Sequence, residues 1–166
     1  GPVDAEALGA IVPSERVIFD LRSRQVPPSS LELASLRDAA LTLPELADLR
    51  AFPMAVTANL CSPSLDVLAD ELTRLASAAD GRPCTVVDVA ACTASGRDPA
   101  GLVALSRRTG VTIIMGVGRS CEAVAAAAVA AATGAQATAD EPTAAEVIAQ
   151  QLVDELTAGV AVAGEG

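Results

Sequence analysis

Three short polar stretches carry the side chains that can bind a ligand or do chemistry, and each adjoins an apolar run. The first, Ser14, Glu15 and Arg16, stands at the start of the apolar segment "RVIFDL". The second, "SGRDP" at 95–99, follows such a segment, and the third, "GVGRSC" at 116–121, ends one. Because α/β proteins place their sites at the ends of parallel strands, these stretches are the first candidates for a functional site.

The segments around Arg97 and Arg119 predict an anion site in one interpretation and ordinary helix starts in another. Both arginines can clamp an anionic group, and backbone N–H groups near Gly118 can help to bind it. "GVGRSC" lacks the third glycine of a dinucleotide-binding fingerprint, because Cys121 occupies that place. In the alternative, which we favour for the first loop, Asp98 caps a helix and Arg97 pairs with a neighbour.

Asp20 and Asp88 are carboxylates within apolar segments that we expect to be buried. A buried carboxylate is costly without a partner, so each is expected to pair or to reach solvent at a strand end. Two adjacent carboxylates can act as general acid and base. Pairing of each with an arginine is the interpretation we favour.

Residue types that are absent exclude several classes of site within these 166 residues. The chain has no histidine, lysine, tyrosine or tryptophan. Histidine-dependent nucleophile triads, Schiff-base chemistry and the lysine-containing phosphate loop are therefore excluded. The four cysteines form no CxxC pair, so we expect buried small hydrophobes rather than disulfides or zinc ligands. They are Cys61, Cys84, Cys92 and Cys121.

Charge and hydropathy limit the classes of binding partner that the chain is expected to have. The net charge is −10 and every basic residue is an arginine, so we expect neither nucleic acid nor an anionic membrane surface as a partner. No apolar run is long enough to span a bilayer, and no secretory leader is visible. We therefore expect a cytoplasmic protein. The first residue is Gly1 rather than methionine, which suggests a processed or incomplete chain.

The order of apolar segments predicts α/β layering. Nearly continuous apolar runs predict buried parallel strands, and a helix between two of them makes a βαβ unit. Prolines divide the long connection between residues 22 and 63 into short helices. The expected strands are 16–21, 84–90, 111–117 and a short one from 160. The expected helices are 31–39, 44–51, 63–80, 99–110, 119–133 and 142–159.

Helix ends and buried faces follow from capping residues and apolar spacing. Expected helix starts are Ser62 with Pro63 and Asp98 with Pro99, and expected helix stops are Gly81, Gly110 and Gly134. The faces expected to be buried comprise Leu65, Leu68, Leu72 and Leu75 in one helix and Val147, Ile148, Leu152 and Leu156 in another.

Three segments in the same order resemble the phosphotriesterase-related metallohydrolases. "GPVDAEALGAIVPSERVIFDL" resembles the amino-terminal signature of that family, with its Gly-Pro segment, Leu-Gly pair and first strand. "TVVDVAACTASGRDPAGLVALSRRTGVTIIMGVG" resembles its second strand, Gly-Arg-Asp loop, helix and third strand. "TAAEVIAQQLVDELTAGV" followed by "AVAGEG" resembles the helix before the fourth strand and the Gly-Glu element on that strand.

The resemblance implies a (β/α)8 TIM barrel in which two divalent metals, usually zinc, activate a water for ester hydrolysis. It also implies that residues 1–166 form a single partial domain, the first half of such a barrel. The family's His-x-His pair falls on Ser14 and Arg16, and Glu165 is the candidate for the bridging metal ligand. One glutamate does not hold two zinc ions, so we expect no cofactor and no hydrolysis by the chain as given.

Three interpretations of function stay open. In the first, the chain is an inactive or truncated relative that pairs with a second copy or a complementary half-barrel, because a half-barrel exposes strand edges and apolar surface. In the second, it is a small α/β module that binds an anion or small ligand through Arg97, Gly118 and Arg119. In the third, the parent protein is an active hydrolase of which this sequence is one part.

Overall fold

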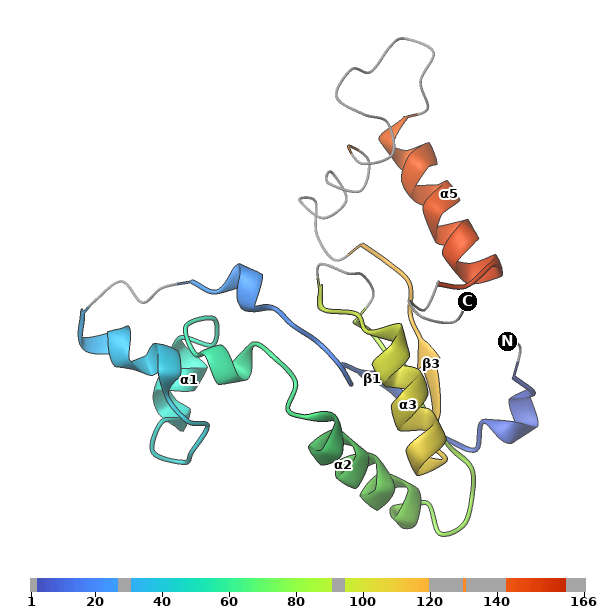
Figure 1. Cartoon of the computed structure of the whole chain (residues 1–166), viewed down its shortest axis with the longest axis horizontal. Helices are drawn as coiled ribbons and strands as arrows, with labels where there is room; N and C mark the ends of the chain where they lie inside the picture. Colours follow the sequence, from blue (N-terminus) through green and yellow to red (C-terminus); the bar gives the residue numbers. More distant parts are fainter. Residues whose placement is uncertain (1–2, 27–30, 91–94, 120–129, 131–142, 161–166) are drawn as a thin grey trace.

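Three parallel strands and the helices that connect them form the centre of the chain. The computed structural model describes residues 3–26, 31–90, 95–119, 130 and 143–160 (Figure 1). The strands lie in the order β1 (Ala10–Glu15), β2 (Cys84–Asp88) and β3 (Thr112–Met115). Helix α2 (Leu65–Ala78) precedes β2, and α3 (Pro99–Thr109) connects β2 to β3. The expected α/β class is confirmed.

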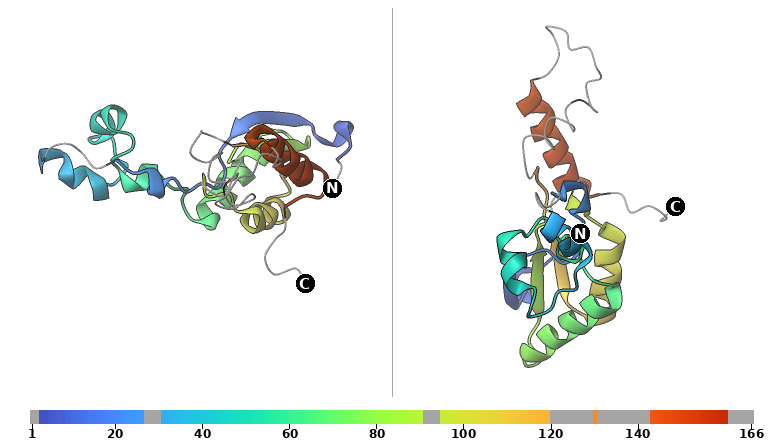
Figure 2. Two further views of the ribbon diagram at one scale, coloured as in Figure 1. Left: turned by 90° about the horizontal axis from the view of Figure 1, so that it is seen from above. Right: turned by 90° about the vertical axis from the view of Figure 1, so that its left-hand side faces the viewer.

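Shorter elements and one further helix surround this centre. They are the 3-10 helices η1 (Ala5–Ala7), η2 (Arg22–Arg24), η3 (Leu31–Asp38) and η4 (Thr57–Asn59), and the helices α1 (Leu46–Ala51) and α5 (Ala144–Thr157). The connection that carries η3 and α1 extends away from the sheet (Figure 1), and α5 lies beyond the carboxyl ends of the strands (Figures 1 and 2). Among the described helices, none combines the length and the apolar character needed to cross a bilayer.

The strand register brings the carboxyl ends of the strands to one edge. Ala10 lies opposite Cys84, and Glu15 lies opposite Asp88 after one extra β1 residue has been accommodated in an irregularity. Asp88 in turn lies opposite Met115. The loops that leave the three strands therefore begin side by side.

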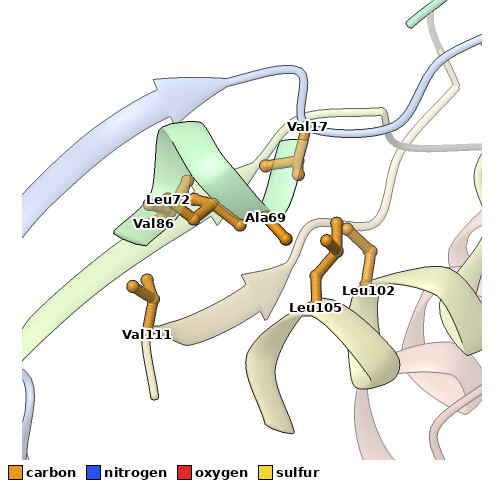
Figure 3. Packing of buried hydrophobic residues seen from close by; sticks show 7 residues of the cluster. All are labelled: Val17, Ala69, Leu72, Val86, Leu102, Leu105 and Val111. Atoms are coloured by element: carbon orange, nitrogen blue, oxygen red, sulfur yellow. The ribbon is translucent and has the colours of Figure 1, made fainter. Parts of the chain in front are cut away.

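One face of the sheet is covered by α2 and α3, and the hydrophobic core lies between these layers (Figure 3). The core cluster comprises Val17, Ala69, Leu72, Val86, Leu102, Leu105 and Val111. Because side chains alternate along a strand, the neighbours of the core-facing residues point the other way. On that second face Ile11, Val89 and Ile114 are 50%, 36% and 37% exposed.

The first strand lies earlier in the sequence than expected. It runs over Ala10–Glu15 and not over residues 16–21, although the latter are richer in β-branched and aromatic residues. β1 is at the edge of the described sheet, where Pro13 is tolerated because an edge strand can dispense with one N–H. Val17, Phe19, Asp20 and Leu21 instead form hydrogen bonds to separate segments of the chain. Asp20 also makes an isolated antiparallel bridge with Cys61.

Helix ends agree with the sequence in α3 and differ in α2. Asp98 caps α3 by accepting from the Gly101 N–H at 3.0 Å, and Gly110 ends it with φ +73°. Ser64, not Ser62, caps α2, so Pro63 lies outside the helix, which ends at Ala78, three residues before Gly81. Leu65, in the first turn, is exposed, while Leu72 is buried as expected.

Several further expectations have definite outcomes. The 31–39 and 44–51 helices are present as η3 and α1, and the 142–159 helix is present as α5. Thr143 and Glu146 form a capping box at the start of α5. Most of the expected 119–133 helix, its stop at Gly134, and the expected strand from 160 lie outside the described residues.

The exposed β1 edge and the uncovered apolar face predict that this chain self-associates. Light scattering coupled to size exclusion should find species larger than the monomer. Ile11→Lys places a charge on this face and should shift the population toward monomer. Val153→Lys on α5 changes a side chain of the same 50% exposure and should not. A wild-type chain that stays monomeric across the concentration range would contradict the prediction.

Candidate functional site

The carboxyl ends of the strands gather most of the polar residues singled out in the sequence. Glu15 ends β1 and Asp88 ends β2. Arg97 lies in the loop before α3, and Arg119 follows β3. The strand register explains this proximity, because loops that leave adjacent parallel strands at one edge are neighbours in space.

The Gly-Arg-Asp loop is fixed against the segment that follows β1. The Asp20 N–H donates to the Ser95 carbonyl at 3.0 Å. Gly96 has φ +75°, and a Cβ atom built there would lie 2.1 Å from the Asp20 nitrogen. Only glycine fits this close approach without movement of the backbone. The loop that carries Arg97 is therefore positioned by the chain that leaves β1.

A cavity of about 490 Å³ opens at the end of β1. Its polar side is formed by Ser14, Glu15, Arg16 and Asn59, and its apolar side by Phe19, Leu21, Met54, Leu60 and Val89. Glu15 accepts a hydrogen bond from the Arg16 backbone N–H at 3.1 Å. A polar rim against an apolar wall is the usual composition of a small-molecule site.

Asp88 is fully buried at the carboxyl end of β2, and one of its oxygens is unpartnered. Its Oδ1 accepts from the Val17 N–H at 2.8 Å, whereas Oδ2 has no hydrogen-bond partner. Burial raises the pKa of the Asp88 carboxyl, and the Val17 and Ala90 N–H groups and the charges of Arg16 and Arg97 only partly oppose this effect. The expected pairing of Asp88 with an arginine is wrong within the described residues, because its oxygens form no ion pair.

Arg97 and Arg119 converge on Glu155 of α5. Arg97 NH1 lies 2.7 Å from Oε2 of Glu155, and Arg119 NH2 lies 3.1 Å from Oε1. Arg119 also donates to the Gly118 carbonyl and to Oε1 of Gln151, each at 3.0 Å. Burial alone would raise the pKa of Glu155, but the hydrogen bonds and charges of the two arginines outweigh it and hold this pKa below its ordinary value. The expected pairing of Arg97 with a neighbour is confirmed.

Glu155 was not among the candidate residues, although the sequence contains a signal for it. Val147, Gln151 and Glu155 are spaced four residues apart and so share a face of α5. Val147 is buried, whereas Leu156, which was expected on the buried face, is 70% exposed. Gln151 and Glu155 lie on the same face of α5 as the buried Val147. Polar residues in line with a buried one indicate that this face packs against other polar groups.

Asp20 forms the arginine pair that was expected of it. Arg22 donates to both of its carboxylate oxygens, at 2.9 and 2.6 Å. The Arg22 side chain and backbone N–H together lower the pKa of Asp20 to about 2. Asp20 is thus held in the charged form by a neighbour two residues away, in a pair that is partly exposed to solvent.

The described residues do not fit a two-metal centre. Within the described part of the chain, no group of three acidic or cysteine side chains is arranged to hold an ion. At the positions where the resemblance implies imidazoles, the chain has Ser14 and Arg16, and a guanidinium repels a divalent cation. Glu165, the candidate bridging ligand, lies outside the described residues.

The structure describes two of the four cysteines. Cys84 is buried at the start of β2, as expected of a small hydrophobe, and Cys61 is half-buried. Both are free thiols. Cys92 and Cys121 lie outside the described residues, as does the end of "GVGRSC".

The environment of Asp88 predicts a pH dependence of stability. Because its pKa is raised above the ordinary value of 3.8 in the folded state, its stabilising contribution is complete below the unfolded-state pKa. That contribution is lost as pH rises through the folded-state pKa. Asp88→Asn keeps an acceptor for Val17 and removes the titration. In urea unfolding from pH 4 to 8, the variant should gain stability relative to wild type, by about 1.4 kcal/mol per unit of pKa shift.

Asp70→Asn is the matched control, since it makes the same change of charge at an exposed position of α2. Its stability difference from wild type should stay constant across this range. A constant difference for Asp88→Asn as well would contradict the raised pKa.

Comparison with known proteins gives a fold relation and no family. No family model and no curated protein matches the chain. A solved structure described as a resiniferatoxin-binding protein from Rhodobacter sphaeroides superposes with a TM-score of 0.74 at 26% sequence identity. The match covers 100% of this chain and 41% of the other. The chain is therefore similar to less than half of that binding protein.

Proposed function

We propose that the chain is part of a larger (β/α)8 barrel of the phosphotriesterase-related type. In this proposal the chain binds a small organic molecule at the end of β1 and does not hydrolyse esters. The cavity of about 490 Å³ bounded by Ser14, Glu15 and Arg16 is the observation that carries it. The cavity combines charged groups with an apolar wall at the strand end where α/β proteins bind their ligands.

Three observations support the half-barrel part of the proposal. The parallel βαβ unit from β2 to β3, with α2 and α3 on one face, is the repeating unit of such a barrel. The second face, with Ile11, Val89 and Ile114 exposed, would become the barrel interior. The similar binding protein is more than twice as long as the region matched, which leaves room for the remaining strands.

The residues at the β1 end favour binding over hydrolysis. Water activation by zinc needs neutral imidazoles and carboxylates around the ion. Here Arg16 brings a positive charge, and Ser14 is a weak ligand. The name of the similar protein describes the binding of an organic molecule, which agrees with an uncharged or weakly polar ligand in the cavity.

The second candidate is an anion-binding module that uses Arg97, Gly118 and Arg119. The convergence of both arginines on one carboxylate favours this candidate. Glu155 already occupies the two guanidinium groups, however, whereas the β1 cavity is open. The organic ligand at β1 is therefore the primary proposal.

The cavity predicts binding of resiniferatoxin or a related amphipathic molecule. Resiniferatoxin is the first probe because the similar protein is named for it. Val89→Asp puts a charge on the apolar wall and should weaken binding in calorimetry at least tenfold, about 1.4 kcal/mol. Val103→Asp on α3 has nearly the same exposure, 37% against 36%, and lies outside this cavity, so it should bind as wild type does. Equal loss in both variants, or no binding by wild type, would contradict the proposal.

The lost metal ligands predict that the chain neither retains zinc nor turns over esters. Elemental analysis of protein purified in zinc-containing buffer should find far less than one zinc per chain. Paraoxon and a panel of lactones should be hydrolysed no faster than in buffer, with or without added zinc. Stoichiometric zinc together with chelator-sensitive turnover would refute the prediction.

A further inference from the structure

The two arginines of the β2–α3 loop and the β3 exit form a nearly enclosed site around one carboxylate. The side chains of Arg97, Arg119 and Glu155 are 7%, 12% and 19% exposed. Each oxygen of Glu155 receives a different guanidinium, at 2.7 and 3.1 Å. Charge-assisted hydrogen bonds of this kind are the strong ones in proteins, and arginine binds carboxylate and phosphate groups with the same fork of donors.

The same contacts attach α5 to the sheet. Among the described residues, the hydrogen bonds from α5 to the loops of the sheet all involve Gln151 or Glu155. The other hydrogen bonds of the helix stay within it or at its cap. On its outer side Val153 and Leu156 are 50% and 70% exposed. Glu155 and Gln151 thus help to hold α5 in its position beyond the strand ends (Figure 2).

We propose that Arg97 and Arg119 form a binding site for a small oxyanion, and that Glu155 is an internal anion that occupies the site. A free phosphate or carboxylate presents two oxygens as Glu155 does, so it can replace Glu155 at both arginines. Two buried guanidinium groups are costly without an anion. The site is therefore filled either by Glu155 with α5 docked, or by the external anion with α5 released.

This exchange makes docking of α5 and binding of the anion mutually exclusive. The tethered carboxylate competes at a high effective concentration, so the apparent affinity for a free anion is low in the wild-type chain. Removing the charge of Glu155 removes the competitor and leaves both arginines in place. The inference deepens the second candidate function, to which it adds Glu155 as the internal competitor, and it does not rest on the β1 cavity of the primary proposal.

Inorganic phosphate is the probe that tests the exchange. In calorimetric titration at constant ionic strength, Glu155→Gln should bind phosphate at least tenfold more tightly than wild type. Asp154→Asn makes the same change of charge one residue away, at an exposed side chain that accepts from Gln150, and should bind as wild type does. Arg119→Gln in the Glu155→Gln background should abolish the gain. Acetate in place of phosphate should show the same order of variants, because the chemistry is that of an oxyanion.

A second measurement keeps the inference testable if Glu155→Gln does not fold. In wild type, phosphate should increase hydrogen exchange in the amides of α5 and leave those of α3 unchanged, and Arg119→Gln should remove this response. Equal phosphate affinity in wild type, Glu155→Gln and Asp154→Asn would overturn the proposal and leave the cluster as a structural ion pair. Tighter phosphate binding in both charge variants alike would overturn it too, as a general effect of net charge.

Discussion

The hydrogen bond from the Val17 N–H to the buried Asp88 carboxylate is the constraint on which the carboxyl end of the sheet depends. Because the Val17 N–H donates to this side chain, it does not pair with the backbone of β2. β1 therefore ends at Glu15. The same hydrogen bond also turns Val17 into the core cluster between the sheet and its two helices. The following residues then bond to Ser62, Ser95 and Leu60. These bonds fix both the wall of the β1 cavity and the loop that carries Arg97.

This constraint explains why the first strand was placed wrongly from the sequence. Local propensity favours residues 16–21, because they are β-branched and aromatic, and disfavours Ala10–Glu15, because of Pro13. Whether a proline is tolerated depends on the strand's position at an edge, and a hydrogen bond to Asp88 spans 71 residues. Neither the edge position of β1 nor this long-range hydrogen bond can be predicted from the residues of the segment itself. By contrast β2, α3 and β3 were predicted well, because Asp98, Pro99 and Gly110 mark the helix ends within the segment itself.

The candidate site was predictable in position and not in its partners. The sequence named Arg97 and Arg119 separately as possible anion clamps at strand ends, and their convergence on one carboxylate came only from the structure. Glu155 lies 58 residues from Arg97, so only the polar face of α5 pointed to it. Arg97 lies near enough to Asp88 to act on it through charge, yet its ion pair is with Glu155. Asp88 is consequently left with an unpartnered oxygen, which no local pattern predicts.

The charged groups at the strand ends differ in their exposure to water, and this exposure determines what each group can bind. Around the β1 cavity, Glu15 and Arg16 are exposed, so water and salt screen them and they can do little more than orient a ligand. In the proposed function the apolar wall adds to the affinity, which suits an organic molecule with one polar end. At Glu155 the charges of the two arginines are largely shielded from water, so this carboxylate offsets part of the cost of burying them. Water can solvate the exposed rim of the β1 cavity, whereas the chain itself supplies the carboxylate that pairs with the buried arginines.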